Sequence, residues 1–149
     1  MVVTSDGGWR PARPRDPEAP REDRLARIAV YGTLRSDSSA ADLLRPLVGA
    51  REQDVLLPGV LYDTGHGYPA LVLDASRHGE TPRPGRGVPA EVYRLHDPAT
   101  ALPILDDYEG PEYERRVLRL APDRPCWVYL WRASVTGMTE LPGGWSTTR

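Results

Sequence analysis

The sequence contains no lysine, asparagine or phenylalanine, and arginine supplies all nineteen of its basic side chains. We interpret this bias as genomic codon usage rather than as a functional signal. Cysteine is nearly absent too: the single Cys126 excludes an internal disulfide framework and suits a reducing cytoplasm. No apolar run approaches membrane-spanning length, and the first residues lack the apolar core of a secretion signal. We therefore expect a cytosolic protein that does not enter a membrane.

An excess of positive charge is also missing. The formal net charge is -2, whereas binding to nucleic acid or to an acidic membrane rests on clustered positive charge. We expect a small-molecule partner instead. Sixteen prolines and fourteen glycines introduce too many turns and breaks for a helical bundle. The length of 149 residues fits one domain, and the sequence leaves open whether the protein is a monomer or a homodimer.

The first 24 residues differ in composition from the rest of the chain. They are rich in proline, arginine and acidic residues and contain little to bury, so they cannot offset the entropy of ordering. Their basic and acidic side chains are balanced, which argues against a nucleic-acid-binding arm. We predict a disordered tail over residues 1–24 and a folded domain over residues 25–149.

Short apolar or alternating runs bounded by glycine and proline predict six strands. These runs span residues 25–35, 59–64, 70–74, 88–95, 113–120 and 126–131. In the last run, CWVYLW, both alternating faces are apolar, which predicts a strand that is covered on both sides or curls into a closed sheet. Six short strands with few helices favour an α+β fold: a small, mostly antiparallel β-barrel with short flanking helices.

Two short helices are expected. Ser38 or Ser39 is suited to cap a helix that Pro46 must limit or kink. A second helix is predicted to begin with Asp97 as the cap and Pro98 at its first position, and to run to about Glu109. Residues 77–87 are predicted to form a surface loop because glycine, proline and arginine dominate them.

The sequence LDDYEGPEYERR, residues 105–116, concentrates carboxylates, and one of them is placed differently from the others. On a helix, Glu109 lies beside Leu105 on the apolar stripe, whereas Asp107 points nearly the opposite way and Asp106 lies at the edge. The negative end of the helix dipole and partial burial should raise the pKa of Glu109 toward the working pH, as general acid–base catalysis requires. The alternative is a structural ion pair of Glu109 with Arg115 or Arg116.

Other reactive or aromatic side chains offer weaker candidates. Cys126 lies in an apolar strand without a neighbouring histidine, which favours a buried structural thiol over a nucleophile. The three histidines are His66, His78 and His96. They are scattered without metal-ligand spacing, so we expect no metal site. His66 could touch a ligand, but an exposed turn residue is the favoured interpretation.

The aromatic side chains of the last strand and of the GHGYP turn are interpreted as packing residues. Trp127, Tyr129 and Trp131 are predicted to lie in the core, since no basic groove accompanies them that would suit stacked bases. Tyr68 and Pro69 are predicted to pack at the barrel mouth rather than to react.

Five segments together resemble the γ-glutamylcyclotransferase-like family, which includes the γ-glutamylamine cyclotransferases and the AIG2-like proteins. The segments are VYGTLR from Val30, GVLYDTGHGYPALV from Gly59, VPAEVYRL from Val88, LDDYEGPEYERRVL from Leu105 and the closing GGW at residues 143–145. The resemblance spans about residues 28–145. It implies a small β-barrel with flanking helices, and conversion of a γ-glutamyl compound into 5-oxoproline and a free amine without a cofactor or metal.

The resemblance also implies roles for particular residues. Glu109 matches the catalytic glutamate of the family, and Tyr113 and Arg115 match a pocket-side tyrosine and a structural arginine. The substrate-binding loop corresponds to Tyr31, Gly32, Thr33 and Leu34. Gly32 would let the backbone approach the ligand, and the N–H groups of Thr33 and Leu34 would hold either the α-carboxylate or the developing oxyanion.

The sequence departs from the family pattern after this loop, where Arg35, Ser36 and Asp37 replace a glycine and basic residues, so the loop could suit another substrate. Ala90 replaces a glycine, and Gly144 replaces an acid in the closing stretch. Two alternatives to an ordinary γ-glutamylcyclotransferase stay open. One is a binding or interaction module without catalysis, and the other is an enzyme that removes a γ-glutamyl protecting group in a specialised biosynthetic pathway.

Overall fold

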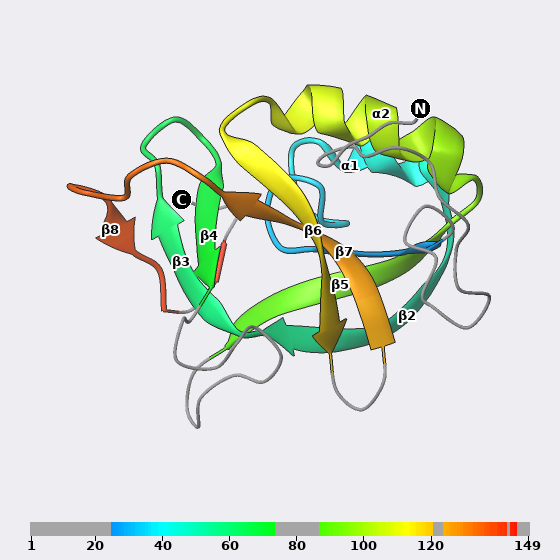
Figure 1. The fold of residues 1–149 in the computed structure, drawn as a ribbon, viewed down its shortest axis with the longest axis horizontal. Coiled ribbons are helices and arrows are strands. Elements are labelled where there is room, and N and C mark those ends of the chain that lie inside the picture. The colour runs from blue at the N-terminus through cyan, green and yellow to red at the C-terminus, as the bar shows by residue number, and fades with distance from the viewer. Residues whose placement is uncertain (1–24, 74–86, 121–123, 143, 146–149) are drawn as a thin grey trace, which may run out of the picture.

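The computed structural model describes residues 25–73, 87–120, 124–142 and 144–145. The tail expected at residues 1–24 and the loop expected at residues 77–87, except Gly87, lie outside this part of the chain. The described residues form two sheets and short helices, so the fold is α+β as predicted (Figure 1).

The larger sheet has five strands. In spatial order they are β2 (Val48–Leu57), β5 (Val88–Leu95), β1 (Arg27–Val30), β7 (Arg124–Trp131) and β6 (Tyr113–Leu120). The central pair β1–β7 is parallel and every other neighbouring pair is antiparallel. The smaller, antiparallel sheet contains β4 (Pro69–Leu73), β3 (Gly59–Asp63) and β8 (Thr139–Glu140).

Helices cover one face of the larger sheet (Figure 1). They are α1 (Ala41–Leu44), which continues into the 3-10 turn η2 (Arg45–Leu47), and α2 (Pro98–Glu109). The helices pack through Leu44, Leu102 and Leu105 against side chains of β1 and β7 such as Ile28 and Trp127. This contact fixes the end of α2 above the sheet.

The central strands divide their side chains between two apolar clusters. Ile28 and Val30 of β1 face the helices, whereas Ala29 faces a second cluster that includes Leu61 and Leu71 of the smaller sheet. Along β7 the side chains alternate in the same manner. Trp127 and Tyr129 face the helices, whereas Cys126, Val128 and Leu130 face the second cluster. All of Cys126–Trp131 is buried, which confirms that this strand is covered on both sides.

The structure corrects the expected strand set. It contains strands in all six predicted places, but β2 and the short β8 were not predicted. In β2 the pairing with β5 is shifted between Val48 and Arg51 and again between Glu52 and Val55, so no regular alternation marks the strand in the sequence. The pairings of the described strands leave β2 and β6 as sheet edges, and the closed barrel is therefore not confirmed.

The ends of the helices follow the prediction only in part. Asp97 occupies the cap position of α2, where it accepts a hydrogen bond from the Thr100 hydroxyl, and Gly110 ends the helix with φ of 86°. The prediction of Ser38 or Ser39 as the cap of α1 is wrong, because Ala40 occupies that position without a side-chain hydrogen bond. The turns before it set the start of α1, since the Ala40 N–H donates to the Thr33 carbonyl.

Among the described residues, no helix is long and apolar enough to cross a membrane.

The start of β3 leaves no room for a side chain at Gly59. A Cβ atom there would lie 2.4 Å from the Val72 carbonyl oxygen of β4, a backbone atom that cannot rotate away. We expect Gly59→Ala to lower the free energy of unfolding by about 1–3 kcal/mol, as overpacking of a core does. Urea denaturation followed by circular dichroism measures this change.

Gly49→Ala is the matched control, because the three atoms nearest to a Cβ atom at Gly49 in β2 all belong to the exposed ring of His96, which can move. An equal loss of stability in both variants would contradict this account of Gly59.

Candidate active site

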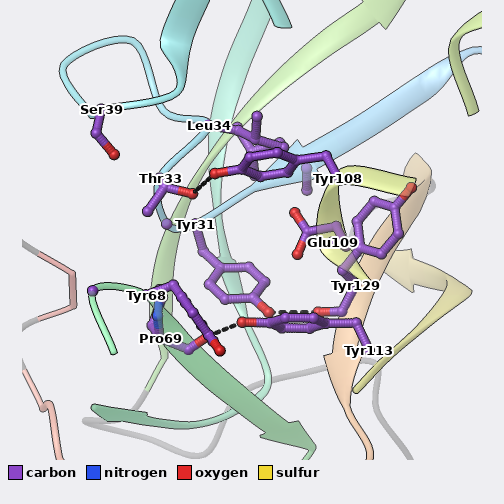
Figure 2. Close-up of a pocket in the computed structure, with 14 residues that line it drawn as sticks. Tyr31, Thr33, Leu34, Ser39, Tyr68, Pro69, Tyr108, Glu109, Tyr113 and Tyr129 are labelled. Carbon is purple, nitrogen blue, oxygen red and sulfur yellow. Dashed lines mark hydrogen bonds between the residues drawn. The ribbon is translucent and has the colours of Figure 1, made fainter. Parts of the chain in front are cut away.

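A pocket of about 350 Å³ lies where the loop after β1, the end of α2 and the turn before β4 meet. Tyrosine side chains and the residues of the predicted binding loop are among those that line it (Figure 2). Its lining includes Tyr31, Gly32, Thr33, Leu34, Ser39, Gly67, Tyr68, Pro69, Tyr108, Glu109, Tyr113 and Tyr129. The structure thus brings together every residue predicted for the site.

Glu109 projects its carboxyl group into this pocket from the last residue of α2 (Figure 2). Leu102 and Leu105 seat the helix in the core, and Glu109, four residues after Leu105, therefore faces inward. Within the described part of the chain, no side chain or backbone group forms a hydrogen bond or ion pair with this carboxyl. Burial first, and then the negative charge of Asp106, raises the pKa of Glu109 to about 7.

The alternative in which Glu109 forms an ion pair with Arg115 or Arg116 is wrong. Arg115 instead donates two hydrogen bonds to Asp106, of 2.8 Å and 3.1 Å, and its guanidinium lies 4.3 Å from the centre of the Trp127 ring. Asp106 also accepts a hydrogen bond of 2.7 Å from the Tyr129 hydroxyl. Arg115 thus ties α2 to the sheet and leaves Glu109 available.

Three tyrosine hydroxyl groups around the pocket are already engaged. Tyr31 donates to the Tyr129 carbonyl at 2.6 Å, and Tyr113 donates to the Pro69 carbonyl at 2.5 Å (Figure 2). The third is the Tyr129 hydroxyl on Asp106. Burial raises the pKa of Tyr31, Tyr113 and Tyr129 above its ordinary value, so these phenols stay protonated near neutral pH.

The loop after β1 presents backbone donors. Within the described residues, the N–H groups of Thr33 and Leu34 donate no hydrogen bond to the protein. The Thr33 hydroxyl shares a 2.7 Å hydrogen bond with that of Tyr108, which holds the loop against α2 (Figure 2). Gly32 serves a purpose that the sequence did not reveal, since a Cβ atom there would lie 2.8 Å from the ring of Pro69. Its lack of a side chain lets the β4 turn approach the loop.

A buried carboxylate outside the pocket anchors the same loop. Glu91 of β5 is 6% exposed and accepts hydrogen bonds from the Ser36 N–H at 2.8 Å and the Ser36 hydroxyl at 3.0 Å. Arg35 lies 3.8 Å from this carboxylate and donates to the Trp145 carbonyl at 2.9 Å. Residues that depart from the family pattern therefore fasten the loop to β5 and to the end of the described chain.

Sequence reasoning missed several residues of the pocket wall. Tyr129 is a core residue as predicted, yet it also lines the pocket, and Tyr68 and Pro69 line the pocket as well as pack. The helical period places Tyr108 on the apolar stripe with Leu102 and Leu105, but its side chain is 43% exposed at the pocket edge. The YEG motif, in which Tyr108 precedes Glu109, is the only sequence signal that could have indicated it.

The other candidate reactive residues, Cys126 and the histidines, are not among the described residues that line the pocket. Cys126 is fully buried, and burial raises the pKa of its thiol to about 11, so it remains a structural residue. His66 is an exposed turn residue and is not part of the pocket lining, whereas His78 lies outside the described residues. The described residues contain no group of three or more histidine, cysteine or acidic side chains that could hold a metal ion.

Several solved structures share this fold. Protein c4763 of uropathogenic Escherichia coli is similar with a TM-score of 0.60 and 17% identity, over 78% of this chain and 87% of that one. PH0828 of Pyrococcus horikoshii is similar with a TM-score of 0.58 and 17% identity, over 78% of this chain and 86% of that one. An AIG2-like protein of Mus musculus is similar with a TM-score of 0.55 and 21% identity, over 79% of this chain and 86% of that one. At these identities the similarity establishes the fold.

Residues 28–147 match the family described as "Gamma-glutamyl cyclotransferase, AIG2-like", and the chain belongs to this family. The family resemblance seen in the sequence is therefore confirmed, and it supports a cyclotransferase type of function in general. No curated protein shows a significant match to the sequence.

The raised pKa of Glu109 has a consequence for stability. Since its pKa rises from 4.5 to about 7 on folding, the folded state binds more protons than the unfolded state between these values. The stability that Glu109 contributes is thus present below pH 4.5 and is lost as the pH rises through about 7. Glutamine cannot ionise, so Glu109→Gln should gain up to about 3 kcal/mol relative to wild type between pH 5 and pH 8.5.

Urea denaturation of both proteins at the two pH values tests this expectation. Asp107→Asn removes an exposed carboxylate from the same helix, and because that group is not buried we expect no comparable gain. A difference between Glu109→Gln and wild type that is the same at both pH values would show that the Glu109 carboxyl is not desolvated.

Proposed function

We propose that the protein is a γ-glutamylcyclotransferase that converts a γ-glutamyl amine or γ-glutamyl amino compound into 5-oxoproline and a free amine. One observation carries the proposal: Glu109, a partly buried carboxyl without a protein partner among the described residues, faces a pocket of about 350 Å³. Its pKa of about 7 lets it both accept and donate a proton near neutral pH.

The chemistry of the substrate makes few demands on the protein. The α-amine of a γ-glutamyl group can reach its own γ-carbonyl and close a five-membered ring. A pocket that holds the substrate in this folded conformation therefore supplies much of the rate acceleration. The ring nitrogen forms its bond to the carbonyl carbon, and the bond from that carbon to the leaving amine breaks. No electron is transferred and no further reactant enters, so the proposed reaction needs no cofactor.

Glu109 manages the protons of this exchange. In its ionised form it takes a proton from the α-ammonium group, which frees the nitrogen lone pair for attack on the carbonyl. The protonated carboxyl then gives this proton to the departing amine, and Glu109 returns to its starting state. The ring nitrogen loses its second proton as the lactam forms, and this proton ends on the released amine, which leaves as its ammonium form. A carboxyl with a pKa far below 7 would be a poor donor in the second step.

The binding loop supports the negative charges of the substrate. The N–H groups of Thr33 and Leu34, which have no acceptor among the residues that the structure describes, suit either the α-carboxylate or the oxyanion that develops on the γ-carbonyl. Tyr31 and Tyr113 donate to backbone carbonyls and shape the pocket walls with their rings. The substrate would be a small molecule of the cytoplasm, which agrees with the single thiol of the sequence.

The first test measures 5-oxoproline release by mass spectrometry. Wild-type protein is incubated with a panel of γ-glutamyl amino acids, γ-glutamyl amines, γ-glutamyl-ε-lysine and glutathione. We expect release from at least one substrate class, and Glu109→Gln should reduce it by about 10²–10⁴-fold because the proton carrier is lost.

Asp107→Asn is the matched control for the loss of one carboxylate on α2, and its rate should stay close to that of wild type. Equal release by wild type and Glu109→Gln would contradict the role of Glu109. Release of no 5-oxoproline from any member of the panel would favour one of the two alternatives: a binding module, or an enzyme with a specialised substrate outside the panel.

The pH dependence gives a second test. Since the first step requires ionised Glu109, kcat/KM should rise about tenfold per pH unit below pH 7 and level off above it. Initial rates from pH 5 to pH 9 with the best panel substrate would establish the profile. A limb with its midpoint near pH 4.5 would mean that Glu109 is not desolvated in the working enzyme.

A further inference from the structure

Glu109 has a charged neighbour on its own helix. Asp106 lies three residues earlier on α2, a spacing that places two Cβ atoms roughly 5–6 Å apart. This carboxylate contacts the edge of the site, because it accepts the hydrogen bond of Tyr129, which lines the pocket. Its negative charge opposes the ionisation of Glu109.

Arg115 of β6 partly neutralises that charge. Its two hydrogen bonds to Asp106 form a fork, and the guanidinium is held in place over the Trp127 ring. Burial alone would raise the pKa of Asp106, but the bonds from Arg115 and Tyr129 outweigh burial and hold the pKa below its ordinary value. Asp106 is therefore ionised throughout the range in which Glu109 titrates.

We propose that Asp106 and Arg115 are positioning residues that set the pH range in which Glu109 exchanges its proton. Asp106 moves this range upward, and Arg115 moves it downward by neutralising Asp106. Removal of the Asp106 charge should therefore shift the range to lower pH, and removal of the Arg115 charge should shift it to higher pH.

In the described part of the chain, Glu109 is the only acidic or basic side chain that lines the pocket. The remaining titratable groups of the lining are phenols, which come from the β1 loop, the β4 turn, α2, β6 and β7. They are Tyr31, Tyr68, Tyr108, Tyr113 and Tyr129. Burial raises the pKa of Tyr31, Tyr113 and Tyr129, so these phenols add no net charge near pH 7. The Asp106–Arg115 pair is therefore the adjustable part of the electrostatic environment of Glu109.

The significance of this arrangement rests on the proposed function, but its test does not require activity. The protein is labelled with glutamate carrying ¹³C at the side-chain carboxyl, and the chemical shift of that carbon is followed from pH 4 to pH 10. The Glu109 signal is identified by its loss in Glu109→Gln. The variants are Asp106→Asn, Arg115→Met, Arg115→Lys and the combination of Asp106→Asn with Arg115→Met.

Asp106→Asn keeps an oxygen that can accept from Tyr129 and removes the charge, so the midpoint of the Glu109 titration should fall by several tenths of a pH unit to about one unit. Arg115→Met keeps an apolar stem over Trp127 and removes the positive charge, so the midpoint should rise. Arg115→Lys should restore most of the wild-type midpoint. Since Arg115 acts through Asp106, Arg115→Met should cause little shift in the Asp106→Asn background.

An unchanged midpoint in Asp106→Asn, or shifts of the same sign in both single variants, would overturn the proposal. Thermal unfolding identifies any variant that does not fold, and Arg115→Lys then provides the milder change. Where the wild-type protein releases 5-oxoproline, the acid limb of kcat/KM should move with the midpoint in each variant. If no 5-oxoproline is released but the Glu109 midpoint shifts in opposite directions in Asp106→Asn and Arg115→Met, the proposed function is rejected and this inference is retained.

Discussion

The central strands β1 and β7 bury both of their faces, and the rest of the structure depends on this constraint. Alternate side chains of each strand contact either the helices or the smaller sheet, so one sheet supports two apolar clusters. Burial of this kind is the main favourable term in folding. The helix layer and the smaller sheet are thereby fixed on opposite faces, and the pocket forms where α2 and the turn before β4 approach the loop after β1.

The position of Glu109 follows from that packing. Leu102 and Leu105 hold α2 on the sheet, and Gly110 ends the helix immediately after Glu109. An unpaired acid at such a site is costly for stability once it ionises, because the buried charge is poorly solvated. Proteins commonly accept such a cost at sites where a group must exchange protons near neutral pH.

The loop opposite Glu109 is held from outside the pocket. Glu91 binds Ser36 through both the backbone and the hydroxyl, while Arg35 connects this carboxylate with Trp145. Gly32 and the Thr33–Tyr108 hydrogen bond fix the other side of the loop. The N–H groups of Thr33 and Leu34, which donate to no group among the described residues, therefore belong to a loop that is held on both sides. Fixed donors of this kind are what stabilisation of a developing charge requires.

Much of the site could be predicted from the sequence, because its central residue obeys a local rule. The 3.6-residue period of α2 and the glycine after it were enough to select Glu109 from its acidic neighbours, and the family motifs indicated the loop of Tyr31 to Leu34. The irregular β2 strand and the pocket roles of Tyr68 and Tyr129 could not be found in this way, since their partners are distant in the sequence. The partner of Arg115 was likewise decided by tertiary structure: β6 brings it to Asp106 rather than to Glu109. Periodicity thus determined which acid faces inward, whereas the packing of distant strands decided which charges surround it, because side-chain contacts depend on separation in space.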